Sequence, residues 1–123
     1  MTRVTLLAAM AASLVFLAAC SEEQAAPSNP NAIEQAIADP LRPEKDRARD
    51  ALRHPGDVLA FTGVKAGDVV VDFGPGSGYY TRLLSRMVGT EGAIYGFTPD
   101  WVAAKFPEMI EGFNTTFSAA DYG

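Results

Sequence analysis

The sequence predicts an α/β fold in which a helix connects two parallel strands. An unbroken apolar run, Val69–Val71, leads through Asp72 into a loop with glycines at alternate positions. Beyond the loop, residues 79–88 place apolar side chains at helical spacing, and a second short apolar run follows at Ala93–Phe97. A strand, a loop, a helix and a second strand in this order are typical of a parallel β-α-β unit.

Length and composition fit one small globular domain. The chain has 123 residues, of which 48% are hydrophobic and 20% charged. Its net charge of -5 argues against a protein that binds nucleic acid by neutralising phosphates. A single cysteine excludes an internal disulfide, and no cluster of histidine, cysteine and acidic residues has the spacing of a metal site.

The first twenty residues have the character of an export signal. Arg3 precedes an apolar segment, Val4–Ala19, that is shorter than the ~20 residues of a membrane span. The stretch "LAAC" that ends at Cys20 resembles the lipobox of bacterial lipoproteins. This resemblance implies removal of residues 1–19, acylation of Cys20 and a membrane anchor. Because Ser21 rather than an aspartate follows, it also implies the outer membrane, on the side facing the periplasm. An uncleaved anchor and a misassigned start codon stay open as alternatives.

Residues 20–42 are expected to form the lipidated cysteine and a flexible tether. Pro27 and Pro30 interrupt a polar stretch that suits an unfolded linker. Within it, Ile33, Ala36 and Ile37 could share one side of two helical turns that end at Asp39-Pro40. The domain itself is expected over residues 43–123.

Two helices are expected ahead of the first strand. Pro43–His54 alternates charges of opposite sign and predicts a solvated helix with a thin buried stripe, and His54 is expected only to end it. The next helix is expected to end at Gly63, where glycine accepts a left-handed conformation. The residues expected to face inward from these helices are Ala48, Ala51, Leu52, Val58, Leu59 and Phe61.

The segment from Val69 onward carries the strongest signals. Consecutive β-branched residues predict a strand, Val69–Phe73, that is covered on both faces. The helix that follows is expected to end at Gly89, and a further helix over residues 100–106 should stop at Pro107, with Trp101 in an ordinary core contact. Residues 108–113 are expected to add another turn. In the helix over 79–88, the expected buried stripe is Tyr80, Leu83, Leu84, Met87 and Val88, with Arg82, Ser85 and Arg86 on the other face.

An acid stands directly before the glycine loop. The spacing is Asp72, Gly74, Gly76 and Gly78, which is G-x-G-x-G rather than the G-x-G-x-x-G of dinucleotide-binding folds. A carboxylate at the strand end would oppose a pyrophosphate and favour a ligand that carries positive charge and no phosphate. S-adenosylmethionine, with its sulfonium and ammonium groups, is such a ligand.

The stretch "VVVDFGPGSG" resembles motif I of the Rossmann-like S-adenosylmethionine-dependent methyltransferases. The resemblance covers about residues 54–100 and implies a Rossmann-like methyltransferase fold with S-adenosylmethionine as cofactor. It further implies that Gly74, Gly76 and Gly78 line the methionine part and that Asp72 holds the loop or the ammonium group. At the position of the family's ribose-binding acid this sequence has Thr98, and Asp100, two residues later, could substitute for that acid. Tyr79, which follows the loop, is expected to face the cofactor pocket.

The expected fold stops after the second of the seven strands that this family usually has. We therefore expect a truncated fragment that is inactive alone, with catalytic residues and methyl acceptor unassigned. The alternative is a non-enzymatic envelope lipoprotein that uses the same scaffold for binding. A nicotinamide-dependent oxidoreductase is disfavoured by Asp72 and by the glycine spacing.

Overall fold

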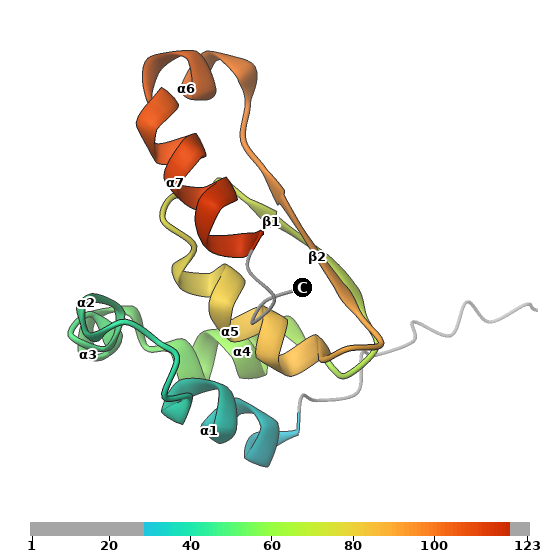
Figure 1. Cartoon of the computed structure of the whole chain (residues 1–123). Coiled ribbons are helices and arrows are strands. Elements are labelled where there is room, and N and C mark those ends of the chain that lie inside the picture. The colour runs from blue at the N-terminus through green and yellow to red at the C-terminus, as the bar shows by residue number, and fades with distance from the viewer. Residues whose placement is uncertain (1–28, 119–123) are drawn as a thin grey trace, which may run out of the picture.

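The computed structural model describes residues 29–118, which adopt an α/β arrangement (Figure 1). Strands β1 (Val69–Phe73) and β2 (Ala93–Phe97) pair in parallel, with Val69 opposite Ala93 and Phe73 opposite Phe97. Helix α5 (Tyr79–Val88) connects them and packs against the sheet. The predicted β-loop-α-β unit is confirmed.

Helix α1 (Pro30–Ala38) is part of the folded unit. Its N-terminus is capped by the Asn29 side chain, which accepts a hydrogen bond from the backbone N–H of Asn31 at 3.0 Å. The helix packs on α5 and on α4 (Pro55–Thr62), and Ile33 and Ala36 are buried there. The expected helical turns are confirmed, but the boundary between tether and domain at residue 43 is wrong, because α1 contributes to the core.

The region between α1 and α4 departs from the predicted single helix. Two short helices, α2 (Glu44–Arg47) and α3 (Asp50–Arg53), replace it. The expected apolar stripe is wrong as well, since Leu52 is 84% exposed and Asp46 is fully buried. In α4, Leu59 is buried as expected, whereas Phe61 is 92% exposed.

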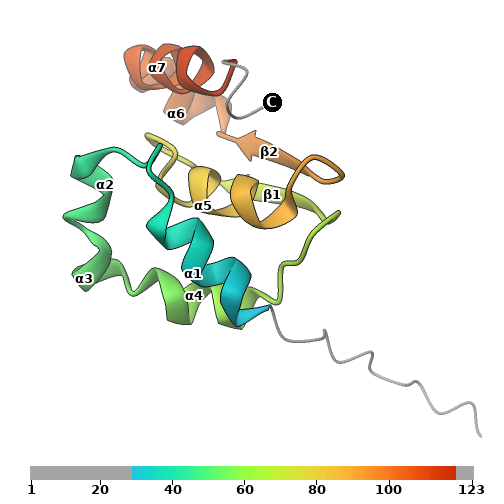
Figure 2. The same cartoon turned by 60° about the horizontal axis from the view of Figure 1, so that its bottom comes forward.

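The hydrophobic core lies between α5 and the pair α1 and α4, on one side of the sheet (Figure 2). Helix α5 provides the largest share of it, and Gly89 ends that helix as predicted. Arg82 departs from the expected pattern, because it is buried rather than solvated. The buried apolar residues are Ile33, Ala36, Leu59, Val64, Tyr79, Leu83, Leu84, Met87 and Val88.

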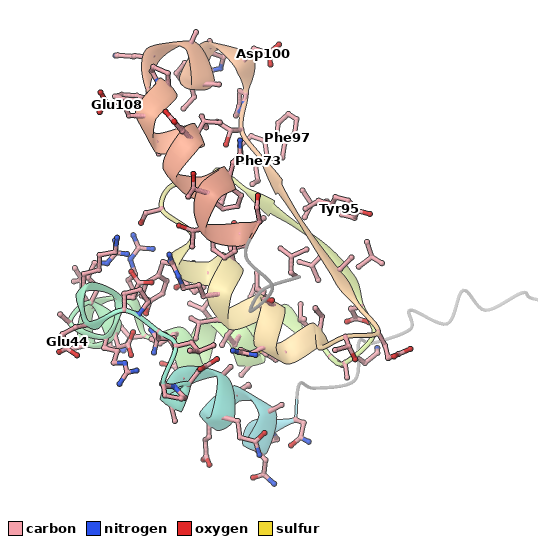
Figure 3. The ribbon with its side chains drawn as sticks, in the orientation of Figure 1. Glu44, Phe73, Tyr95, Phe97, Asp100 and Glu108 are labelled. Carbon is pink, nitrogen blue, oxygen red and sulfur yellow. The ribbon has the colours of Figure 1, made fainter. Side chains whose placement is uncertain are left out.

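The other face of the sheet is exposed in the described part of the chain. Figure 3 shows Tyr95 projecting from the sheet on the side away from the helices. Phe73 and Phe97 stack across the strands with ring centroids 5.4 Å apart, and both are more than half exposed. The expectation of a strand covered on both faces is therefore wrong for β1 within residues 29–118.

Two helices follow β2. Helix α6 (Asp100–Lys105) ends before Pro107, as predicted, but its Trp101 is 74% exposed instead of packed in a core. Helix α7 (Pro107–Phe117) is longer than the single turn expected. It returns toward the sheet, where a Cβ added at Gly96 would lie 2.8 Å from the Phe113 ring.

No helix within residues 29–118 combines the length and apolar character needed to span a bilayer. The export signal and Cys20 lie outside the described residues.

Candidate functional site

The glycine loop, residues 74–78, turns the chain from β1 into α5. Gly74, Gly76 and Gly78 all have positive φ angles, of 71°, 58° and 82°. Side chains rarely adopt this left-handed conformation, which explains glycine at each position. The backbone N–H of Gly74 donates to the Phe97 carbonyl at 2.8 Å and ties the loop to the end of β2.

Asp72 stands half-buried where β1 ends and faces α5. The Thr81 hydroxyl donates a hydrogen bond to its Oδ2 at 2.7 Å. Its Oδ1 has no hydrogen-bond partner in the described part of the chain. Asp72 therefore fixes the start of α5 with one oxygen and leaves the other available to a ligand.

A pocket of about 280 Å³ opens beside the glycine loop. We call it the glycine-loop pocket. The structure brings Asp72, Gly74, Gly76 and Tyr79 of the predicted site together around it, and adds two arginines that no pattern in the sequence indicates. Its lining residues are Arg49, Arg53, Asp72, Phe73, Gly74, Pro75, Gly76, Ser77, Tyr79 and Tyr80.

The two arginines change the electrostatics of the glycine loop. The sequence predicted that the carboxylate of Asp72 would repel phosphate from the loop. With Arg49 and Arg53 lining the same pocket, charge alone does not exclude a phosphate. Whether the pocket prefers a cationic ligand or a phosphate therefore depends on where Asp72 and the two arginines lie around the loop.

Tyr79 lines the pocket, as predicted, but most of the side chain is buried. Its hydroxyl donates to Asp50 Oδ1 at 2.6 Å. Burial, with a smaller contribution from this hydrogen bond, raises the pKa of Tyr79 to about 12. The Asp50 carboxylate also accepts two hydrogen bonds from Arg42, at 2.6 and 2.9 Å, and the bond to Arg42 holds the pKa of Asp50 below its usual value.

A second buried ion pair connects the glycine loop to α2. Arg82 donates from Nη1 to Asp46 Oδ2 at 3.0 Å, and the same nitrogen donates to the carbonyls of Ser77 and Gly78 at 2.8 and 3.0 Å. Both side chains are 95% or more buried. The helical spacing predicts Arg82 on the solvated face of α5, so no local pattern in the sequence indicates this pair.

Thr98 and Asp100 do not join the site. Neither residue lines the glycine-loop pocket, and Asp100 is exposed at the start of α6. Figure 3 shows Asp100 beyond the end of the sheet, at the helical turn of α6. The structure therefore gives no support to either residue as a substitute for the family's ribose-binding acid.

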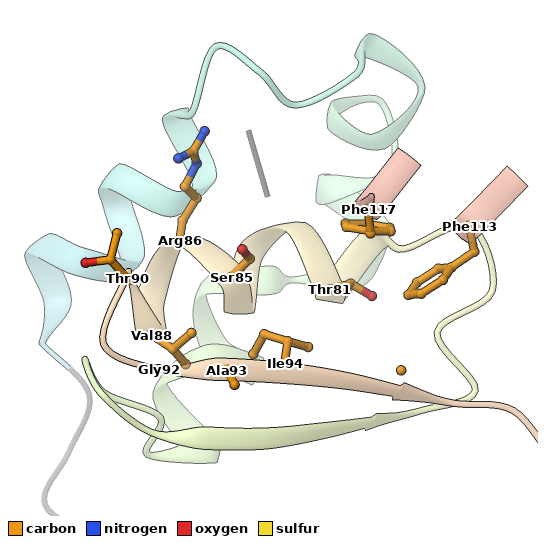
Figure 4. Close-up of a pocket in the computed structure, with 12 residues that line it drawn as sticks. Thr81, Ser85, Arg86, Val88, Thr90, Gly92, Ala93, Ile94, Phe113 and Phe117 are labelled. Atoms are coloured by element: carbon orange, nitrogen blue, oxygen red, sulfur yellow. The ribbon is translucent and has the colours of Figure 1, made fainter. Parts of the chain in front are cut away.

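A larger pocket of about 430 Å³ lies between α5, β2 and α7, with Phe113 and Phe117 at one end (Figure 4). Arg86 is the charged residue among those that line it, and it is paired with Asp39. The predicted site residues do not line this pocket. We therefore place the candidate site at the smaller pocket.

His54 ends α3 in a left-handed conformation with φ of 46°, in keeping with the expected helix-end role. Within residues 29–118, no group of three or more histidine, cysteine or acidic side chains is arranged to hold a metal ion.

No protein-family model, curated protein or solved structure matches the chain.

Proposed function

We propose that the glycine-loop pocket binds S-adenosylmethionine and that the chain is a lipid-anchored, exported member of the Rossmann-like methyltransferases. The observation that carries the proposal is the junction of β1 and α5. There, an acid with one uncommitted carboxylate oxygen precedes three positive-φ glycines, of which Gly74 and Gly76 line the pocket and Gly78 is buried beside Phe117.

The loop leaves room for a ligand to approach the backbone. A Cβ added at Gly74 or Gly76 would meet no heavy atom within 4 Å, so the space over these two residues is open. The ammonium group of the cofactor would reach Asp72 Oδ1 from that space. The protein would then contribute to methyl transfer by holding the sulfonium methyl in line with an acceptor, through proximity and orientation.

The proposal is tested by calorimetric titration of the full chain, in mild detergent, with S-adenosylhomocysteine. Asp72→Asn keeps an oxygen that can accept from Thr81 but removes the negative charge. Because a hydrogen bond to a charged group contributes about 1.5–3 kcal/mol, we expect this variant to bind at least tenfold more weakly.

Thr81→Val is the matched control, because it removes the hydroxyl bond to Asp72 and leaves the charge. We expect its loss of affinity to be smaller than that of Asp72→Asn. Unchanged affinity of Asp72→Asn would reject the role of this carboxylate, and the absence of any binding to the unaltered chain would reject the proposal.

Attachment through Cys20 to the outer membrane, facing the periplasm, is part of the same proposal. It is supported by the apolar segment that ends in "LAAC" and by the serine that follows.

A further inference from the structure

The glycine-loop pocket carries charge of both signs. Asp72 contributes an acid at the end of β1, and Arg49 and Arg53 contribute cations from the region of α3. A purely cationic ligand would gain nothing from the arginines, and a phosphate would gain nothing from the acid. The α-amino acid group, with an ammonium and a carboxylate on one carbon, matches both.

Of the two arginines, Arg53 is the one free to bind a ligand. Arg49 donates from Nη2 to Asp46 Oδ1 at 3.0 Å, so its charge is already paired. The guanidinium of Arg53 has no carboxylate or hydrogen-bond partner within residues 29–118. Its one described interaction is with aromatic faces, and a guanidinium that stacks on a ring keeps its N–H groups available at the edge.

Arg53 is held in position although it is exposed. Its guanidinium carbon lies 4.7 Å from the centroid of the Tyr79 ring and 5.9 Å from that of Tyr80. The Tyr80 hydroxyl donates to the Arg53 backbone carbonyl at 3.2 Å. The left-handed conformation of His54 then turns the chain directly after Arg53. These contacts fix the α3 end against the first turn of α5, beside the loop.

We propose that Arg53 binds the carboxylate of the amino-acid end of the ligand, while Asp72 accepts its ammonium group. This inference rests on the proposed function, because it identifies which part of S-adenosylmethionine each charge contacts. A planar guanidinium can form two parallel hydrogen bonds with a carboxylate, and such pairs are stronger than bonds between neutral groups.

The test compares two ligands that differ in the amino-acid group. S-adenosylhomocysteine has it, and 5′-methylthioadenosine does not. We expect Arg53→Gln in the full chain to weaken binding of S-adenosylhomocysteine by about ten- to a hundredfold in calorimetry. Binding of 5′-methylthioadenosine should change by less than about twofold. Lys45→Gln is the matched control, since it removes an exposed positive charge from α2 outside the pocket, and it should leave both affinities unchanged.

The outcomes separate the inference from the proposed function. If Arg53→Gln binds S-adenosylhomocysteine as tightly as the unaltered chain, the inference is wrong and the cofactor proposal stands. If the variant loses affinity for both ligands equally, Arg53 shapes the pocket without contacting the carboxylate, and the inference is wrong. If the unaltered chain binds neither ligand, the proposed function fails, and the inference fails with it.

Discussion

Arg82 of α5 lies 3.0 Å from the buried carboxylate of Asp46, although 36 residues separate them along the chain. The same guanidinium nitrogen bonds to two carbonyls of the glycine loop. Asp46 in turn also pairs with Arg49, which lines the glycine-loop pocket. One fully buried acid therefore connects α2, the glycine loop and a wall of the pocket.

Removing this acid should destabilise the protein strongly. Asp46→Ala leaves the buried guanidinium of Arg82 without its counter-charge, and breaking a buried ion pair in this way costs about 3–5 kcal/mol. We expect a loss of that size in the free energy of unfolding, measured by urea denaturation followed by circular dichroism.

The double variant Asp46→Leu with Arg82→Met is the control for this prediction. It removes both charges together and should recover part of the lost stability, because well-packed apolar residues often replace a buried pair at little cost. A double variant that is less stable than Asp46→Ala would contradict the assignment of the loss to an unpaired charge.

Tyr79 should cause the free energy of unfolding to fall at alkaline pH. Its pKa in the folded protein is about 12, above the value of about 10 for an unfolded tyrosine. The neutral hydroxyl is therefore favoured by folding, and its contribution is complete below pH 10 and is lost as the pH rises through 12. We expect Tyr79→Phe to reduce the fall in unfolding free energy between pH 10 and 12. The exposed Tyr95 is the control, and an equal effect of Tyr95→Phe would contradict the prediction.

The absence of a side chain at Gly76 should be needed for ligand binding as well as for the backbone conformation of the loop. Gly76 and Gly67 both have positive φ and no heavy atom within 4 Å of an added Cβ, but Gly67 lies in the turn before β1 and does not line the pocket. Alanine should therefore cost about 1–2 kcal/mol of stability at either position. We expect Gly76→Ala alone to weaken binding of S-adenosylhomocysteine, and equal affinities of the two variants in calorimetry would argue against ligand approach at this loop.

Cys20 should tether the protein to membranes. Acyl chains contribute about 0.8 kcal/mol per buried methylene, so their loss should release the chain into the soluble fraction. We expect Cys20→Ser to shift the protein from the membrane pellet to the supernatant after ultracentrifugation. Ser21→Ala is the control and should stay in the pellet. A Cys20→Ser variant that still pellets with membranes would reject lipidation as the sole anchor.

The β-α-β unit was predictable because its signals are local. The β-branched run at Val69–Val71, the apolar spacing in 79–88 and the glycines at 63 and 89 each specify an element or its end without reference to distant residues. The exposed face of β1 was not predictable in this way. A continuous apolar strand has two faces that are suited to burial, but its sequence does not specify whether other elements cover both of them. The described helices cover only the face of β1 that bears Val70 and Asp72.

The glycines and Asp72 were identified from the sequence, but the cations of the site were not. In residues 43–54 the alternating charges indicated a solvated helix, since charged residues are almost never fully buried unless paired. Asp50 and Asp46 of this segment pair with Tyr79 and Arg82 of α5, which lie 29 and 36 residues later in the chain. A pairing over that distance has no local pattern, so Asp46 and Arg53 acquire a role only once α2 and α3 lie beside the start of α5.

Cofactor binding at the glycine loop is tested most directly by a nuclear magnetic resonance titration of the ¹⁵N-labelled full chain, in detergent, with S-adenosylhomocysteine. We predict that the amide resonances of Gly74 and Gly76, which line the pocket, shift with increasing ligand, while those of Gly67 and Gly112 stay in place. The same titration with NAD should leave the loop glycines unchanged, because the loop lacks the G-x-G-x-x-G spacing that places a pyrophosphate at the helix N-terminus. Loop glycines that shift with NAD but not with S-adenosylhomocysteine would contradict the assignment of this loop to S-adenosylmethionine.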